Sequence, residues 1–213
     1  QVVTIVTPQG TGSGFYISDG LLLTNHHVIE GFTKVKVRFF GGRELPAEVL
    51  RSDAQRDVAL VKVEGGGMTG LPIQFDKPQV GARVYVVGSP LGERNEGTVT
   101  TGIVSAFRET KQGPLIQSDA AVTHGNSGGP LFDDKGNILG ITMAVSIGQG
   151  GAEVAGLNFF IPIDDALRAM QVSVAGMPAT STVAAAAGGR EIQVAMYPAD
   201  GPLMKSGKTQ AVP

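Results

Sequence analysis

The feature that most restricts the fold of this chain is a series of short runs with the composition of β-strands, separated by turns. Pairs such as Asp19-Gly20 and Gly41-Gly42 mark these turns, because glycine supplies the positive φ that a tight hairpin needs. The expected strands cover residues 2–6, 14–18, 21–24, 35–40, 44–51, 58–64, 83–89, 98–109, 115–118, 130–133, 138–145 and 157–163.

A glycine- and proline-rich break divides these runs into two sets of six. The break extends from Gly65 to about Pro78 and has no strand pattern. A set of six antiparallel strands can close into a barrel, which removes exposed sheet edges. We therefore expect an all-β fold of two six-stranded antiparallel β-barrels, with a short C-terminal helix at residues 162–171. A single β-sandwich is an alternative that the strand pattern also fits.

The domain organisation follows from the same break and from a later change in composition. We expect an N-terminal β-barrel at residues 1–78 and a C-terminal β-barrel with the final helix at residues 79–175. Residues 176–213 are rich in alanine and glycine and have the composition of a linker and tail. Within that tail, residues 191–197 have the pattern of one more strand.

Charge and cysteine content narrow the classes of partner. The formal net charge is −2, and lysine and arginine are scattered, so no basic stripe predicts nucleic-acid binding. No run reaches the roughly 20 apolar residues of a membrane-spanning helix. The chain has no cysteine, which excludes disulfides and Cys-zinc sites. We expect no metal and no cofactor.

The segment Gly125-Asn126-Ser127-Gly128-Gly129-Pro130 is the strongest candidate for chemistry. A tight glycine-rich loop can expose the hydroxyl of Ser127 as a nucleophile. The same loop can direct the N–H groups of Gly125 and Ser127 to one point, where they would stabilise an oxyanion. We place the oxyanion hole at Gly125, Asn126 and Ser127. An ordinary glycine-rich turn is the simpler alternative for this string alone.

A nucleophilic serine needs a base, and the chain has three histidines: His26, His27 and His124. The adjacent pair His26-His27 follows an expected strand. Adjacent side chains point in different directions, so the pair does not resemble two ligands of one metal ion. A metal-dependent hydrolase that uses these histidines is nevertheless kept as a competing hypothesis.

The base needs an orienting carboxylate, and Asp57 is the candidate. It stands directly before the apolar run of residues 58–63. A carboxylate at the mouth of a buried strand needs a partner. His27, Asp57 and Ser127 follow the order His…Asp…Ser, one of the known orders of the catalytic triad of serine hydrolases. The first two fall in the first set of strands and the third in the second, which places the site between the two barrels.

Several motifs occur together in one order and resemble those of a trypsin-like serine protease of the HtrA/Deg type. They are Gly12-Ser-Gly-Phe-Tyr-Ile-Ser, Leu23-Thr-Asn-His-His-Val-Ile29, Asp57-Val-Ala-Leu-Val-Lys, Val87-Gly-Ser-Pro-Leu-Gly92, Thr101-Gly-Ile-Val-Ser105, Gln117-Ser-Asp-Ala-Ala-Val122, Gly125-Asn-Ser-Gly-Gly-Pro-Leu131 and Leu139-Gly-Ile-Thr.

The resemblance covers about residues 1–171. It implies a double β-barrel, no cofactor, and serine endopeptidase activity on proteins in quality control or regulated proteolysis. The catalytic histidine of the family directly precedes Val-Ile, which selects His27 over His26. The segment after the final helix is too short for the peptide-binding PDZ domain that HtrA proteins usually carry, so we expect a protease domain without one.

The resemblance also implies a specificity pocket. Ala121 lies six positions before Ser127, where an aspartate selects Lys or Arg substrates in trypsin-type enzymes. Val122, Ala144 and Val145 would complete a small apolar pocket, so we expect small aliphatic P1 residues. His124 borders the oxyanion loop and would line the substrate cleft; a solvent-exposed loop histidine is the alternative.

The expected partners are protein or peptide substrates and, in a homo-oligomer, further copies of the chain. The expected location is periplasmic, in the cell envelope, or secreted. A catalytically silent, peptide-binding pseudoprotease or chaperone is the main alternative function. A regulatory tail that occupies the cleft is a further hypothesis.

Overall fold

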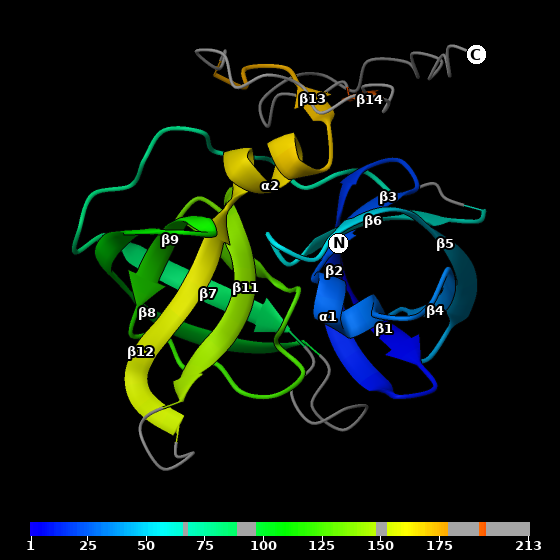
Figure 1. Cartoon of the computed structure of the whole chain (residues 1–213), viewed down its shortest axis with the longest axis horizontal. Helices are drawn as coiled ribbons and strands as arrows, with labels where there is room; N and C mark the ends of the chain where they lie inside the picture. Colours follow the sequence, from blue (N-terminus) through cyan, green and yellow to red (C-terminus); the bar gives the residue numbers. More distant parts are fainter. Residues whose placement is uncertain (66–67, 89–96, 148–152, 179–191, 195–213) are drawn as a thin grey trace.

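The computed structural model describes residues 1–65, 68–88, 97–147, 153–178 and 192–194. Most of the expected tail, residues 176–213, therefore lies outside the described residues. Two closed barrels of six antiparallel strands stand side by side, and a short helix lies over the line where they meet (Figure 1). The all-β prediction of two six-stranded barrels is confirmed, and the single β-sandwich is wrong.

The first barrel has the strand order β1-β2-β3-β6-β5-β4 and appears blue to cyan in Figure 1. Its strands are β1 (Val2–Thr7), β2 (Gly10–Ser18), β3 (Leu21–Thr24), β4 (Lys34–Arg38), β5 (Glu44–Asp53) and β6 (Val58–Val63). In β4, Val35 and Val37 are buried, whereas Lys34 and Lys36 are exposed. This alternation places one face of the strand on the barrel core and the other in solvent.

The second barrel has the strand order β10-β11-β12-β9-β8-β7 and appears green to yellow in Figure 1. Its strands are β7 (Arg83–Gly88), β8 (Thr98–Thr110), β9 (Gly113–Ser118), β10 (Pro130–Phe132), β11 (Ile138–Ile147) and β12 (Glu153–Pro162). Register shifts between Thr142 and Ala144 bend β11 against β12. Such bulges increase the twist that a closed barrel requires.

The segment between the barrels is docked on both of them. The N–H of Leu71 donates to the carbonyl of Tyr16 in the first barrel, and the N–H of Gln74 donates to Ile138 in the second. Ile73 forms a parallel bridge with Ile138. The sequence indicated only a break here, and the structure shows a packed connection.

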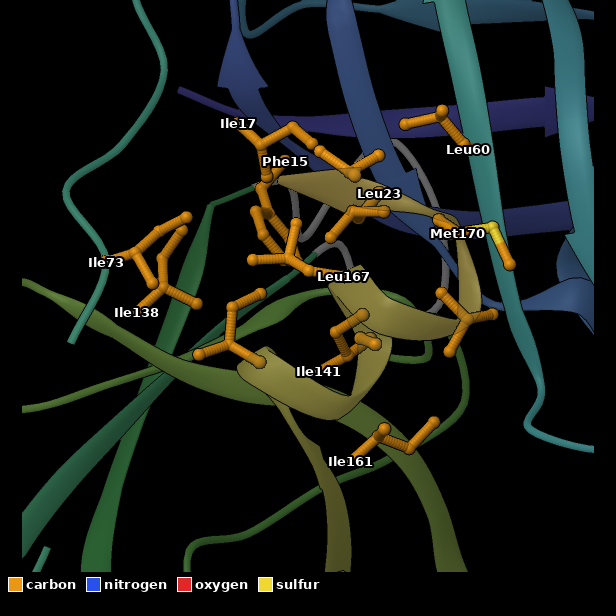
Figure 2. Packing of buried hydrophobic residues seen from close by; sticks show 14 of the residues in the cluster. Phe15, Ile17, Leu23, Leu60, Ile73, Ile138, Ile141, Ile161, Leu167 and Met170 are labelled. Carbon is orange, nitrogen blue, oxygen red and sulfur yellow. The ribbon is translucent and has the colours of Figure 1, made fainter. Parts of the chain in front are cut away.

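The helix α2 (Ile163–Ala169) lies over the boundary between the two barrels, on one side of the molecule (Figure 1). It is shorter than the expected helix at residues 162–171, because Pro162 is its N-cap and Gln171 has a φ of 52°. Figure 2 shows Leu167 and Met170 packed among side chains of both barrels, including Phe15, Leu60 and Ile161. One hydrophobic cluster therefore contains residues of both barrels and of the helix.

Two further strands, β13 (Val172–Val174) and β14 (Ile192–Val194), form a parallel pair after α2. The sequence indicated the second but not the first. β13 has only three residues, and it places Val172 and Val174 in the core shared by both barrels. No helix in the described part of the chain is long and apolar enough to cross a membrane.

Candidate active site

The single-turn helix α1 (His26–Ile29) positions the two adjacent histidines. Its N-cap, Asn25, directly follows β3, has an extended backbone and is completely buried. The Nδ1 atom of His26 contacts the hydroxyl of Ser52, whereas the ring of His27 meets Asp57. The two side chains therefore diverge, as expected for adjacent residues.

The carboxylate of Asp57 holds His27 by two kinds of contact. Its Oδ2 atom lies 2.8 Å from His27 Nδ1, and its Oδ1 atom accepts a hydrogen bond of 3.0 Å from the backbone N–H of His27. Asp57 has a φ of 59°, an uncommon backbone conformation for a residue other than glycine. The side-chain amide of Asn25 donates to the carbonyl of Asp57 at 2.8 Å and holds that conformation.

These contacts determine the tautomer of His27. An ionised carboxylate can only accept hydrogen bonds, so the hydrogen atom of this pair is on His27 Nδ1. The neutral ring then has its lone pair on Nε2. That is the atom a general base would use to accept a proton from a hydroxyl.

Ser127 lies in a tight loop between β9 and β10. The N–H of Asn126 donates to the carbonyl of Thr123, and the N–H of Gly129 donates back to the carbonyl of Asn126. Gly125 and Gly128 have φ angles of 98° and 82°, in the region that favours glycine. Glycine at these two positions therefore allows the backbone conformation that the loop adopts.

The loop is attached to the first barrel through Ser13 on β2, a completely buried polar residue. The N–H of Ser13 donates to the carbonyl of Ser127 at 2.8 Å, and its hydroxyl donates to the carbonyl of Gly125 at 2.7 Å. The hydroxyl of Thr24, three residues before His27, donates to the carbonyl of Ser13. Ser13 thus links the loop of the second barrel to the histidine segment of the first.

The N–H groups of Gly125 and Ser127 donate to no backbone carbonyl within the described residues. The N–H of Asn126 is already used by Thr123, and its side chain is buried. Gly125, Asn126 and Ser127 stay the predicted oxyanion hole, and in this conformation the N–H of Asn126 donates inside the loop.

The structure brings His27 and Asp57 into contact but leaves Ser127 without a hydrogen bond to His27. Within the described residues, no hydrogen bond joins the hydroxyl of Ser127 to the imidazole ring. Such bonds are often long or poorly aligned in the absence of substrate. His27 and Asp57 are thus already in contact, and Ser13 attaches the loop of Ser127 to the first barrel.

The residues expected to line the specificity pocket lie in two segments. Ala121 and His124 are exposed, and Val122 is buried in the core of the second barrel. Thr100 on β8 donates its hydroxyl to the carbonyl of Ala121 at 2.7 Å, which fixes that segment. The backbones of Ala144 and Val145 belong to β11, and their side chains lie outside the described part of the structure.

Sequence reasoning missed Ser13 as a structural partner of the nucleophile loop. The string Gly12-Ser13-Gly14 belongs to one of the motifs that resemble the family. Ser13 is 112 residues before Gly125, so the sequence did not indicate their contact. In the described part of the chain, no group of three or more His, Asp and Glu side chains is arranged to hold a metal ion.

Comparisons with known proteins agree with this architecture. A family model for the trypsin-like peptidase domain matches residues 12–141. The putative serine protease HhoB of Synechocystis sp. is 44% identical over 168 residues, which cover 74% of this chain and 39% of that protein. A probable periplasmic serine endoprotease of Hahella chejuensis, described as DegP-like, is 43% identical over 168 residues, covering 76% of this chain and 35% of that protein.

A solved structure of similar shape is that of the HtrA-type protease AlgW with a decapeptide. It superimposes with a TM-score of 0.70 at 29% sequence identity, over 80% of this chain and 63% of that chain. The chain spans little more than a third of the length of the two curated relatives.

Proposed function

The chain belongs to the trypsin-like peptidase family, as a serine protease domain of the HtrA/DegP type, and from this premise we propose that it hydrolyses peptide bonds in protein substrates through an acyl-enzyme at Ser127. The observation that carries the proposal is the contact of 2.8 Å between His27 Nδ1 and Asp57, next to a loop that presents Ser127. We assign the roles of base, orienting carboxylate and nucleophile to His27, Asp57 and Ser127.

In the first half of the reaction, the hydroxyl oxygen of Ser127 attacks the carbonyl carbon of the scissile peptide. The proton of that hydroxyl passes to Nε2 of His27, and Asp57 stabilises the imidazolium. His27 then gives the proton to the amine nitrogen as the C–N bond breaks. In the second half, water attacks the ester of Ser127, and His27 again accepts and returns a proton.

The oxyanion of each tetrahedral intermediate would be stabilised by the N–H groups of Gly125 and Ser127. Their lack of backbone partners within the described residues supports this role, since a donor already used inside the loop could not serve. One such donor is typically worth about 2.7–4 kcal/mol of transition-state stabilisation.

For substrate preference, we propose small aliphatic P1 residues. Ala121 offers no charge to a Lys or Arg side chain, and apolar Val122 follows it. His124 is exposed beside the loop, a position compatible with contact to bound peptide. Ala144 and Val145 stay in the proposal on the basis of the family resemblance.

We place the activity in protein quality control or regulated proteolysis in the periplasm or cell envelope. The support is the name of the Hahella chejuensis relative, which is a probable periplasmic endoprotease. Protein or peptide substrates are the proposed partners, and the solved structure of the HtrA-type protease AlgW contains a decapeptide. Assembly into a homo-oligomer and the division of the chain at residues 78 and 175 are kept as parts of the proposal.

A silent peptide-binding protein is the second candidate function, because Ser127 and His27 are not hydrogen-bonded among the described residues. Digestion of an unfolded protein, followed by mass spectrometry of the products, separates the two. We expect cleavage mainly after Val and Ala, and no cleavage by Ser127→Ala. Efficient cleavage after Arg but not after Val or Ala would contradict the proposed pocket, and binding without cleavage by the unmodified chain would favour the silent protein.

A further inference from the structure

Arg56, the residue directly before Asp57, carries a buried positive charge from the first barrel to the second. Its relative exposure is 7%, and it stands in the turn between β5 and β6. A guanidinium remains charged at all physiological pH values. A charge that cannot be neutralised and is shielded from water needs partners on every side.

Those partners come from elements outside the first barrel. The Nε atom of Arg56 donates to the carboxylate of Asp165 in the first turn of α2, and its Nη2 atom donates to the carbonyl of Pro114 on β9. Gly113 lies against the guanidinium, since a Cβ atom there would be 3.1 Å from Cζ and Nε of Arg56. The arginine therefore occupies a site formed by the second barrel and α2.

The backbone of Arg56 is fixed as well as its side chain. Its N–H donates to the carboxylate of Asp53 at 2.9 Å, within the same turn. The next residue, Asp57, has a φ of 59° and is held on its other side by the amide of Asn25. Asp57 is thus held on one side by Asn25 of the first barrel. On the other side it follows Arg56, whose side chain contacts α2 and the second barrel.

We propose that Arg56 is a positioning residue, and that its ion pair with Asp165 sets the location of Asp57 relative to Ser127. This inference rests on the proposed function of the same site. Removal of a charge partner from a buried pair is strongly disruptive, but such pairs often contribute little net stability. The role proposed for the Arg56–Asp165 pair is to fix a position, because Asp57 comes from one barrel and Ser127 comes from the other.

The chain contains a matched control at the opposite end of the same helix. Arg51, also at the β5–β6 end of the first barrel, donates to the carbonyls of Met170 and Gln171 just after α2. Like Arg56, it ties the first barrel to the region of α2, but it is not adjacent to Asp57 in the sequence. A purely structural role would give Arg51 and Arg56 the same phenotype.

The first experiment compares Arg56→Gln, Arg56→Lys, Asp165→Asn and Arg51→Gln in peptide hydrolysis, well below the Tm of each variant. We expect Arg56→Gln to lower kcat about ten- to a hundredfold, the effect of a small misplacement at a catalytic site, with KM unchanged. Arg56→Lys should recover part of the loss, because lysine keeps the charge but not the planar donor pair. Arg51→Gln should lower Tm and leave kcat unchanged.

Asp165→Asn tests the same contact if Arg56→Gln does not fold, because the amide has nearly the size of the carboxylate. It should lower kcat and leave KM unchanged. Wild-type kcat in folded Arg56→Gln or Asp165→Asn, or an equal loss of kcat in Arg51→Gln, would overturn the proposal.

A second readout does not depend on turnover. In Ser127→Ala protein labelled with ¹⁵N-histidine, NMR measures how fast the Nδ1 proton of His27 exchanges with water. We expect faster exchange after Arg56→Gln and no change after Arg51→Gln; equal rates in all three proteins would contradict the positioning role. If the unmodified chain does not cleave peptides, the proposed function fails, and this exchange rate still decides whether Arg56 positions Asp57.

Discussion

At the scale of single residues, Asp57 is the group on which the orientation of His27 depends. It accepts hydrogen bonds from both the backbone and the ring of that histidine. Asp57→Asn would keep the size of the side chain, but the amide can donate and would favour the wrong tautomer. We expect kcat to fall about 10⁴-fold with little change in Tm.

The measurement is steady-state hydrolysis of a peptide substrate with thermal unfolding as the control for folding. Asp134→Asn, at an exposed position in the hairpin between β10 and β11, is the control substitution. An Asp57→Asn protein with near wild-type kcat would show that His27 is not oriented by this carboxylate.

Tyr16 provides a residue-scale prediction about pH. Its side chain is completely buried and, within the described residues, its hydroxyl has no hydrogen-bond partner. Burial, with a smaller contribution from Asp19, raises the pKa of Tyr16 to about 12. Because the unfolded tyrosine ionises near pH 10, the folded state should lose up to about 2 kcal/mol of stability as the pH rises from 10 to 12.

Tyr16→Phe should abolish this alkaline loss, since phenylalanine has no proton to release. At pH 7 the variant should be equal to or more stable than the parent, because it removes a buried hydroxyl that has no partner. Urea unfolding at pH 7 and at pH 11 checks both statements. The same fall in stability for parent and variant would mean that another group causes the alkaline transition.

At the scale of elements, the loop that carries Ser127 depends on glycine where it contacts the first barrel. A Cβ atom at Gly128 would lie 2.3 Å from the carbonyl oxygen of Ser13 and 2.4 Å from the hydroxyl of Thr24. Gly136, in the hairpin between β10 and β11, has a similar φ of 80° but no atom within 4 Å of such a Cβ.

Gly136→Ala should therefore cost only the strain of the left-handed backbone, about 1–2 kcal/mol. Gly128→Ala should cost distinctly more, because it adds a steric clash, and it should displace Ser127 enough to abolish hydrolysis. Urea unfolding and peptide hydrolysis of both variants test the difference. Equal effects would show that backbone conformation alone explains the need for Gly128.

The strands could be predicted because their signals are local, and the triad candidates could be predicted from their order in the chain. The alternation of Val35 and Val37 with lysines identifies β4 from a few neighbouring residues. Asp57 precedes an apolar strand and Ser127 lies in a glycine-rich string, but each alone also fits an ordinary turn, and the order His…Asp…Ser is what made them triad candidates.

The missed features all depend on distant contacts. The role of Ser13 depends on carbonyl groups more than a hundred residues later, and Arg56 meets Asp165 at a separation of 109 residues. The strand β13 is only three residues long, too short for a periodic pattern to show. Its two valines become part of a core only when both barrels and α2 are assembled.

At the scale of the whole molecule, we expect the hydrophobic cluster shared by the two barrels to make them unfold as one cooperative unit. Leu167 on α2 is completely buried in the cluster that contains Leu60 of the first barrel and Ile161 of the second. Figure 2 shows the helix between these two groups of side chains. Leu167→Ala should lower the free energy of unfolding by about 2–5 kcal/mol.

Differential scanning calorimetry should show one transition for both the parent and Leu167→Ala, shifted to lower temperature in the variant. Val61→Ala, buried in the core of the first barrel alone, is the control. Two transitions, of which Leu167→Ala moves only one, would mean that the barrels unfold independently.

The proposed active site spans the same boundary, because His27 and Asp57 come from the first barrel and Ser127 comes from the second. The central claim is that Ser127 is a nucleophile activated by His27. Reaction with a fluorophosphonate probe, mapped by mass spectrometry, tests it most directly. We predict covalent labelling of Ser127 that disappears in Ser127→Ala and falls strongly in His27→Ala but not in His26→Ala. An unlabelled Ser127 in the folded chain, or equal labelling in His27→Ala, would contradict the claim.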